Sequence, residues 1–113
     1  MKITIIGSTL YKDKMIELKE RLEKEGDVVK MPAFDFDNFD ELGICINNRI
    51  IIEWADEIHI FWDQRSMGTV FDFGMVFMAR KRLVIEYVEA KTLYGVMKKY
   101  ALHYKAILGK DYE

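Results

Sequence analysis

Four short runs of mostly apolar, β-branched residues alternate along the chain with stretches whose apolar residues recur at helical spacing. Continuous apolar runs are typical of strands buried on both faces, because a strand with one face in water alternates apolar and polar side chains. When strands alternate with helices, each helix carries the chain back to begin the next strand in the same direction. The sequence therefore predicts an α/β fold with a parallel sheet. The predicted strands cover residues 2–7, 27–31, 57–62 and 82–88.

The segments between these strands predict three layers. We expect a short flavodoxin- or Rossmann-like sheet of about four strands in the order 2-1-3-4, with helices on both faces. Ligands of such sheets bind beyond the carboxyl ends of the strands, where the strand order reverses. Here that point lies between the first and third strands. The expected helices run from the loop after Gly7 to Gly26, and over residues 41–56, 69–81 and about 90–108.

The size and charge of the chain limit what it can be. A length of 113 residues, half of them apolar, fits a single domain over residues 1–113. A net charge of −2 gives no electrostatic reason to expect a nucleic-acid polymer or a membrane as partner. No apolar run is long enough to cross a bilayer. Because a strand pattern begins at once and the only cysteine, Cys45, allows no internal disulfide, we expect a cytoplasmic location.

One carboxylate stands in an otherwise apolar helical segment, GTVFDFGMVF (68–77). Burying an unpaired carboxylate is costly, so Asp72 either favours the helix dipole or faces a cavity where its charge is used. Its neighbours at i+3, i+4 and i+7 are Met75, Val76 and Ala79, so its face of the helix is not a solvated charged one. The segment begins just beyond a loop that faces the predicted crevice. We therefore interpret Asp72 as a site residue.

Two polar loops face this crevice. Gly7 and Ser8 follow the first strand, where free backbone N–H groups at a helix start suit an anion, and Ser8 is equally suited to cap the helix. The second loop supplies Asp63, Ser66 and Gly68, which on their own fit a turn with a capping hydroxyl. No Walker lysine and no GxGxxG motif is present, which disfavours ordinary ATP and dinucleotide sites.

Other polar and aromatic residues are interpreted as structural or stay open. The acidic loop 33–40 lacks the glycine and closing glutamate of an EF-hand, so no metal site is expected there. Its phenylalanines either stack on a base or fill the core. His59 and His103 have no cysteine or carboxylate partner at ligand spacing and are interpreted as structural, and Cys45 as a core residue.

Residues 55–85, ADEIHIFWDQRSMGTVFDFGMVFMARKRLVI, resemble the signature of the nucleoside 2-deoxyribosyltransferase superfamily. That signature has an Ala-Asp pair, an apolar strand, a polar loop, a glycine, a carboxylate-x-Gly on a helix, and a basic residue before the next strand. With the opening IIGS, the resemblance extends to about residue 88. It is nearer to the 2'-deoxynucleoside 5'-monophosphate N-glycosidase branch, whose spacing through Ser66-x-Gly68 to Asp72 is matched without a gap.

The resemblance implies roles for individual residues. Asp72 stands where the family has its nucleophilic glutamate, and Asn48 where it has an aspartate that holds the sugar. Transferases acting on free nucleosides carry an aspartate at the position of Ser66, and a serine there suits a 5'-phosphate because it does not repel it. Ser8 matches a second serine on the phosphate side. Asp63 is similar to an acid of the transferases.

Three functions are consistent with these residues. The resemblance favours hydrolysis of the base–deoxyribose bond of 2'-deoxynucleoside 5'-monophosphates, with no cofactor and no metal. A transferase that exchanges bases on free deoxynucleosides is supported by Asp63. A non-catalytic nucleotide-binding module is supported by two differences from the family: Asp72 is one methylene shorter than the glutamate nucleophile, and Leu10 stands where the N-glycosidase branch has an arginine. A homodimer or larger homo-oligomer is expected from the resemblance and from the Met- and Phe-rich segment 73–79.

Overall fold

The computed structural model describes residues 1–31, 40–62 and 67–88, and the structural statements below concern these residues. The predicted helix over about 90–108 and nearly all of the acidic loop lie outside them. The elements, in chain order, are β1 (Lys2–Gly7), a short 3-10 helix η1 (Thr9–Tyr11), α1 (Lys12–Lys24), β2 (Val28–Lys30), α2 (Glu41–Trp54), β3 (Glu57–Trp62), α3 (Met67–Ala79) and β4 (Arg82–Val88).

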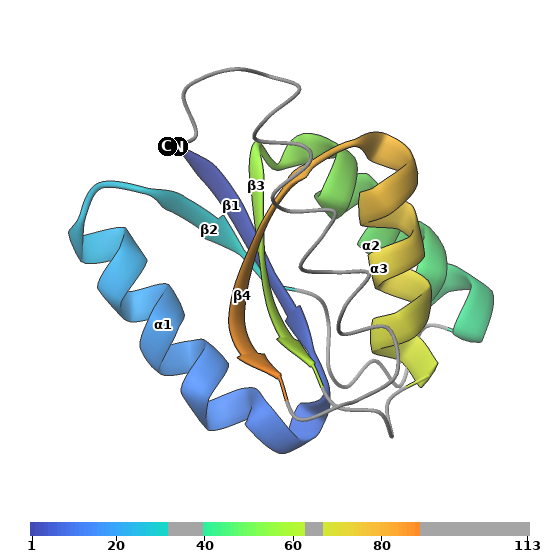
Figure 1. Cartoon of the computed structure of the whole chain (residues 1–113), viewed down its shortest axis with the longest axis horizontal. Coiled ribbons are helices and arrows are strands. Elements are labelled where there is room, and N and C mark those ends of the chain that lie inside the picture. The colour runs from blue at the N-terminus through green and yellow to red at the C-terminus, as the bar shows by residue number, and fades with distance from the viewer. Residues whose placement is uncertain (32–39, 63–66, 89–113) are drawn as a thin grey trace.

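The four strands form one parallel sheet in the order β2-β1-β3-β4 (Figure 1). The predicted α/β fold and strand order are thus confirmed. The pairing of β3 with β4 is irregular, because Ile60 pairs with Ile85 but Phe61 pairs with Tyr87. This bulge places the Tyr87 side chain on the same face of the sheet as Phe61.

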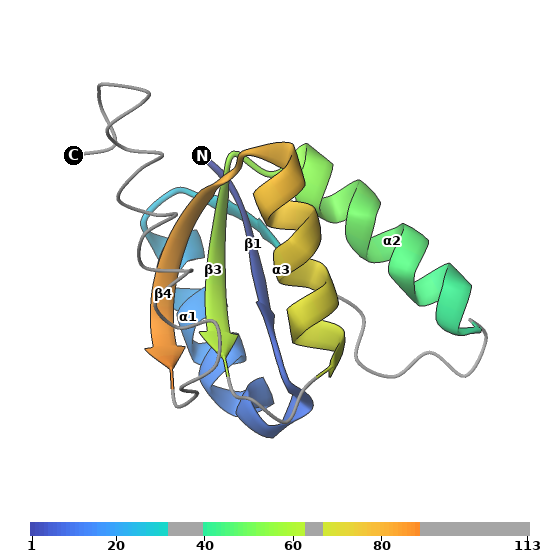
Figure 2. The same ribbon diagram turned by 45° about the vertical axis from the view of Figure 1, so that its right-hand side comes forward.

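Helices cover both faces of the sheet, as predicted. Figures 1 and 2 show α1 on one face and the pair α2 and α3 on the other. Because side chains alternate along a strand, each strand of the sheet's centre contributes to two separate apolar clusters. The cluster beneath α2 and α3 contains Ile6, Ile52, Ala55, Ile58, Ile60, Trp62, Phe73, Val76 and Leu83. The cluster beneath α1 contains Ile3, Ile5, Met15, Leu18, Leu22, Val29 and Phe61.

Local signals set the ends of the helices. The side chain of Asp40 accepts a hydrogen bond of 2.7 Å from the backbone N–H of Gly43 and so caps the start of α2. Gly26, with φ of 98°, adopts the left-handed conformation just after α1. The predicted bounds of α2 and α3 are two residues too late at their ends, since Ala55 is already extended and Arg80 has a φ of 57°.

Two further findings bear on the sequence-based expectations. None of the helices in the described part of the chain is long and apolar enough to cross a membrane. Cys45, predicted in the core, is only partly buried in α2.

Candidate active site

The carboxyl ends of β1 and β3 lie next to each other where the strand order reverses. Gly7 ends β1, and a Cβ atom at this position would lie 2.8 Å from the carbonyl oxygen and 2.9 Å from the Cβ of Phe61. Real Cβ contacts are not that short, so only glycine allows β1 to approach β3 this closely. The predicted site residue Gly7 therefore sets the spacing of β1 and β3 at the carboxyl ends of the two strands.

Asp72 and Asn48 are brought together by the two helices that cover the same face of the sheet, α2 and α3. Asp72 projects from α3 and Asn48 from α2, and both are buried. The amide Nδ2 of Asn48 donates to both carboxylate oxygens of Asp72, at 3.4 Å each. Both bonds are longer than the usual 2.7–3.2 Å for such a pair, which makes them weak. The Oδ1 atom of Asn48 is buried and has no hydrogen-bond partner in the part of the chain that the structure describes.

The environment of Asp72 changes its acidity. Burial raises the pKa of Asp72 to about 6 from the usual 3.8, and the hydrogen bond from Asn48 opposes this shift in part. A pKa of about 6 lies below 7, so the ionised carboxylate is the favoured form at neutral pH. A buried, ionised carboxylate that lacks strong hydrogen bonds has the properties of a nucleophile or of a stabiliser for a nearby cation.

Ser8 follows Gly7 and caps η1. Its Oγ accepts a hydrogen bond of 3.2 Å from the backbone N–H of Leu10, and its carbonyl oxygen accepts one of 3.0 Å from Tyr11. The predicted capping role of Ser8 is therefore observed, although a three-residue 3-10 helix precedes the α-helix that was expected here directly. A capping hydroxyl still has its own O–H to donate, so the cap is compatible with a contact to phosphate.

Of the remaining predicted site residues, the structure describes Gly68 but not Asp63 or Ser66. Gly68 lies in the first turn of α3, with open space where a Cβ would be. Asp63 and Ser66 lie outside the described residues. The structure thus brings Asp72 and Asn48 into contact and places Gly7 and Ser8 at the carboxyl end of β1. The predicted roles of Asp63 and Ser66 stay predictions.

Trp62 is a candidate site residue that the sequence reasoning missed. It is the last residue of β3, it is 1% exposed, and its indole Nε1 is buried without a hydrogen-bond partner among the described residues. Its ring meets that of Phe73 edge to face, with centroids 6.3 Å apart. Buried polar atoms are nearly always paired in folded proteins, so Trp62 Nε1 is an exception at the carboxyl ends of the strands, and this makes Trp62 a candidate for a role at the site. The available signal was a tryptophan at the end of a buried strand, since its N–H needs a partner.

A second buried polar cluster, the His59 cluster, lies on the α1 face of the sheet. His59 Nδ1 lies 2.6 Å from Glu86 Oε2, and His59 Nε2 lies 2.7 Å from Glu57 Oε1. Arg82 Nε lies 3.1 Å from the other carboxylate oxygen of Glu57. The prediction that His59 lacks a carboxylate partner is therefore wrong, because residues two apart in a strand share a face and β4 adds the second acid.

The protonation of His59 follows from these neighbours. Burial lowers the pKa of His59, but the hydrogen bonds and charges of Glu57 and Glu86 outweigh it and hold the pKa above its usual 6.5. The protonated form of His59, which these neighbours favour, neutralises carboxylates that are themselves poorly solvated. Within the described residues, no group of three or more His, Cys, Asp or Glu side chains has a metal-binding arrangement.

Comparisons with known proteins bear on the fold. No protein-family model matches the chain, and no curated protein sequence matches it. Among solved structures, the chain is similar to the Clostridium botulinum CMP N-glycosidase BcmB, with a TM-score of 0.67 and 16% sequence identity over 90% of this chain and 81% of that chain. The two proteins share a fold.

Proposed function

We propose that this protein is an N-glycosidase that hydrolyses the bond between base and deoxyribose in 2'-deoxynucleoside 5'-monophosphates. The observation that carries the proposal is the buried Asp72 carboxylate, held by Asn48 beside the carboxyl edge of a sheet whose fold is shared with a CMP N-glycosidase. Ligands of parallel α/β sheets bind at the carboxyl ends of the strands, which supports a substrate position close to the start of α3.

Asp72 supplies the chemistry in this proposal. Cleavage of an N-glycosidic bond passes through an oxocarbenium-like state, which a carboxylate next to C1' stabilises. An oxygen of Asp72 bonds to C1' while the C1'–N bond breaks, and the base leaves with the bonding electron pair and takes a proton from solvent. Water then attacks C1', the bond to Asp72 breaks, and the carboxylate and deoxyribose 5-phosphate are released with a proton passing to solvent.

Asn48 holds both partners in this scheme. Its amide N–H groups face the Asp72 carboxylate, and its unpaired Oδ1 is free to accept a hydrogen bond from a sugar hydroxyl. An asparagine carries no charge, so only one member of the pair titrates. An aspartate at this position would raise the pKa of Asp72 further, because two carboxylates in contact cannot easily both ionise.

Two serines in the loops after β1 and β3 are the proposed donors to the substrate phosphate. Ser8 retains an O–H to donate, since its Oγ accepts from the backbone of Leu10. Ser66 is proposed as the second donor from the sequence resemblance. Hydroxyl and amide donors favour a dianionic phosphate over a neutral 5'-hydroxyl, so we expect nucleotides rather than nucleosides as substrates.

An incubation with nucleotides tests the proposal directly. The protein is mixed with each of the four deoxynucleoside monophosphates, with CMP and with the matching deoxynucleosides, and free base is followed by liquid chromatography. Release of base and deoxyribose 5-phosphate from deoxynucleotides by the wild type, and not by Asp72→Asn, is expected. Base exchange that needs an added free base would indicate the transferase instead. Binding without turnover, measured by calorimetry, would indicate a binding module.

A further inference from the structure

Three buried side-chain atoms have no hydrogen-bond partner among the described residues: Thr4 Oγ1, Asn48 Oδ1 and Trp62 Nε1. All three side chains lie between the sheet and the helices α2 and α3. Asn48 belongs to α2 and Trp62 to the apolar cluster beneath it, and Thr4 alternates along β1 with Ile3 and Ile5 of the α1 cluster. A buried polar atom without a partner costs stability. This cost is therefore concentrated in the layer that contains the proposed nucleophile.

Trp62 and Asn48 contact the same helix at consecutive residues. The Trp62 ring meets the ring of Phe73 with centroids 6.3 Å apart, and the Asn48 amide donates to Asp72, the residue before Phe73. Trp62 is also the last residue of β3, whereas Thr4 lies in the middle of β1. The unpaired donor of Trp62 and the unpaired acceptor of Asn48 thus lie next to the proposed active site, and Thr4 lies further from it.

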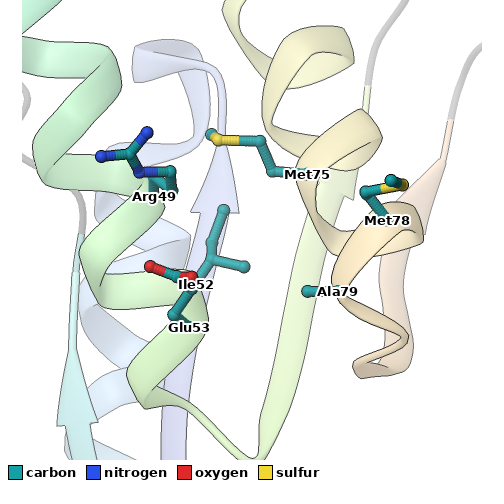
Figure 3. A pocket seen from close by; sticks show the side chains of 6 residues that line it. All are labelled: Arg49, Ile52, Glu53, Met75, Met78 and Ala79. Atoms are coloured by element: carbon teal, nitrogen blue, oxygen red, sulfur yellow. The ribbon is translucent and has the colours of Figure 1, made fainter.

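The two helices close this layer on the side away from the carboxyl ends of the strands. Both α2 and α3 begin near those ends and run back toward the amino ends (Figure 2). One turn beyond Asn48 and Asp72 come Ile52 and Met75, and Figure 3 shows both of these side chains between the helices. Ile52 is 1% exposed. A ligand therefore approaches the pair from the carboxyl ends, where Trp62 lies.

We propose that Trp62 Nε1 and Asn48 Oδ1 bind one hydroxyl group of the substrate between them. A hydroxyl donates one hydrogen bond and accepts two, so a single hydroxyl supplies the acceptor that Trp62 lacks and the donor that Asn48 lacks. This assignment rests on the proposed function, which identifies the group. A 2'-deoxynucleoside 5'-monophosphate has one sugar hydroxyl, on C3', because C2' carries only hydrogen and O5' carries the phosphate.

The burial of the two atoms restricts the substrate to free mononucleotides. Trp62 Nε1 and Asn48 Oδ1 are closed from solvent, so an oxygen that bonds to both is closed from solvent as well, and it enters as the indole or the amide turns. A phosphate on O3' would remove the hydrogen that Asn48 Oδ1 accepts and would bury a charge without a partner. We therefore expect 3',5'-bisphosphates and nucleotides within a DNA strand to be excluded.

The indole N–H signals test the assignment by nuclear magnetic resonance without any need for turnover. The only tryptophans of the chain are Trp54 and Trp62, so a proton–nitrogen correlation spectrum identifies the Trp62 signal as the one that remains in Trp54→Phe. The four deoxynucleoside monophosphates, and deoxyribose 5-phosphate as a ligand without a base, are titrated into the wild type. The Trp62 indole proton should move downfield. The matching 2',3'-dideoxynucleoside monophosphates should not move it, and the Trp54 signal at the end of α2 is the internal control.

A substitution of the donor measures its effect on affinity. Trp62→Phe keeps an aromatic ring against Phe73 and removes the N–H. We expect it to bind deoxynucleoside monophosphates roughly tenfold more weakly than the wild type and to bind the dideoxy compounds equally well. Trp54→Phe is the matched control and should bind both classes as the wild type does. Calorimetry measures the affinities, and circular dichroism establishes that each variant is folded.

The possible outcomes separate this assignment from the proposed function. A Trp62 signal that moves only with ligands carrying the 3'-hydroxyl, without release of base, supports the assignment and overturns the hydrolysis. Release of base with an unmoved Trp62 signal, or with equal shifts from deoxy and dideoxy ligands, overturns the assignment alone. Failure of all these ligands to bind overturns both. If Trp62→Phe does not fold, the titration of the wild type decides.

Discussion

The molecule buries two polar clusters, one on each face of its sheet, and they are built in opposite ways. The His59 cluster has hydrogen bonds of 2.6 and 2.7 Å and a third contact of 3.1 Å to Arg82, and it joins neighbouring strands. The Asn48–Asp72 pair has only bonds of 3.4 Å, and it joins two helices. Asn48 Oδ1 and, in the apolar cluster beneath these helices, Trp62 Nε1 are buried without a hydrogen-bond partner among the described residues.

The difference favours a stabilising role for the His59 cluster and is consistent with the ligand-binding role that we propose for the Asn48–Asp72 pair. Charges that neutralise one another at short distance inside a protein hold elements together, and their loss exposes a buried charge. A buried carboxylate with long bonds and unpaired neighbours costs stability and is retained where a ligand completes its contacts. The pKa values agree, since the partners of His59 favour its charged form while burial disfavours the charged form of Asp72.

Replacing the carboxylate should give the largest effect. Asp72→Asn is expected to lower glycosidase activity by at least about 1,000-fold, because the amide is not a nucleophile. The same change should raise the free energy of unfolding at pH 7 by up to roughly 3 kcal/mol, since it removes a carboxylate whose pKa is raised from 3.8 to about 6. Activity assays and urea unfolding measure the two effects. An active variant, or one much less stable than the wild type, would contradict the assignment of Asp72.

A companion variant uses the same assay. Asp72→Glu is expected to keep or raise activity, because it recreates the reach of the glutamate found in the family that the sequence resembles. A folded Asp72→Glu protein that binds nucleotide without turnover would point to Asn48, or to the arginine replaced by Leu10, as the limiting difference.

Breaking the His59 cluster should affect stability and not chemistry. His59→Gln leaves Glu57 and Glu86 without their shared cation, and we expect a loss of roughly 3 kcal/mol in the free energy of unfolding. Lys19→Ala is the control, because the exposed Lys19–Glu23 pair is worth about 0.5 kcal/mol or less. Equal stabilities of the two variants in urea would show that the His59 cluster is not a stabilising element.

The pH dependence of stability separates the two clusters. Asp72 binds its proton more tightly in the folded state, so its contribution to stability falls as the pH rises from about 4 to about 6. The raised pKa of His59 contributes stability that is fully present below pH 6.5 and is lost as the pH rises through the folded pKa above that value. Thermal unfolding across this range should therefore show that Asp72→Asn lacks the loss of stability between about pH 4 and about pH 6. His59→Gln should lack the loss of stability above pH 6.5. A single decline that survives in both variants would contradict these assignments.

The smallest expected effect concerns the phosphate. A deoxynucleoside 5'-monophosphate should bind at least about tenfold more tightly than its nucleoside, because charge-assisted hydrogen bonds contribute roughly 1.5–3 kcal/mol each. Ser66→Asp should reverse this preference by repelling the phosphate and accepting from a 5'-hydroxyl. Calorimetry with both ligand classes measures the ratio, and Lys19→Ala serves as an unrelated surface control. Equal affinities in the wild type would mean that Ser8 acts only as a cap.

The sequence predicted most of the fold because local patterns specify it. The runs at 57–62 and 82–88 are mostly apolar and rich in β-branched and aromatic residues, and the observed bounds of β3 and β4 coincide with them. Asp72 stood out for the same reason, as a charge on an apolar helix face. Glu57 could have been found, because it lies two residues from His59 on the same strand face. Glu86 and the Nε1 of Trp62 could not, because they depend on packing across the sheet and on the irregular pairing after Ile60.

The glycine at the end of β1 has a consequence for anyone who would redesign the substrate range of this protein. Because position 7 lies against the backbone of Phe61, a side chain there would push β1 away from β3, and Ser8, the next residue, would move with β1. A combinatorial library that varies residues 8–11 and keeps Gly7 therefore preserves the position at which the loop begins. A library that also varies position 7 changes that position in every member.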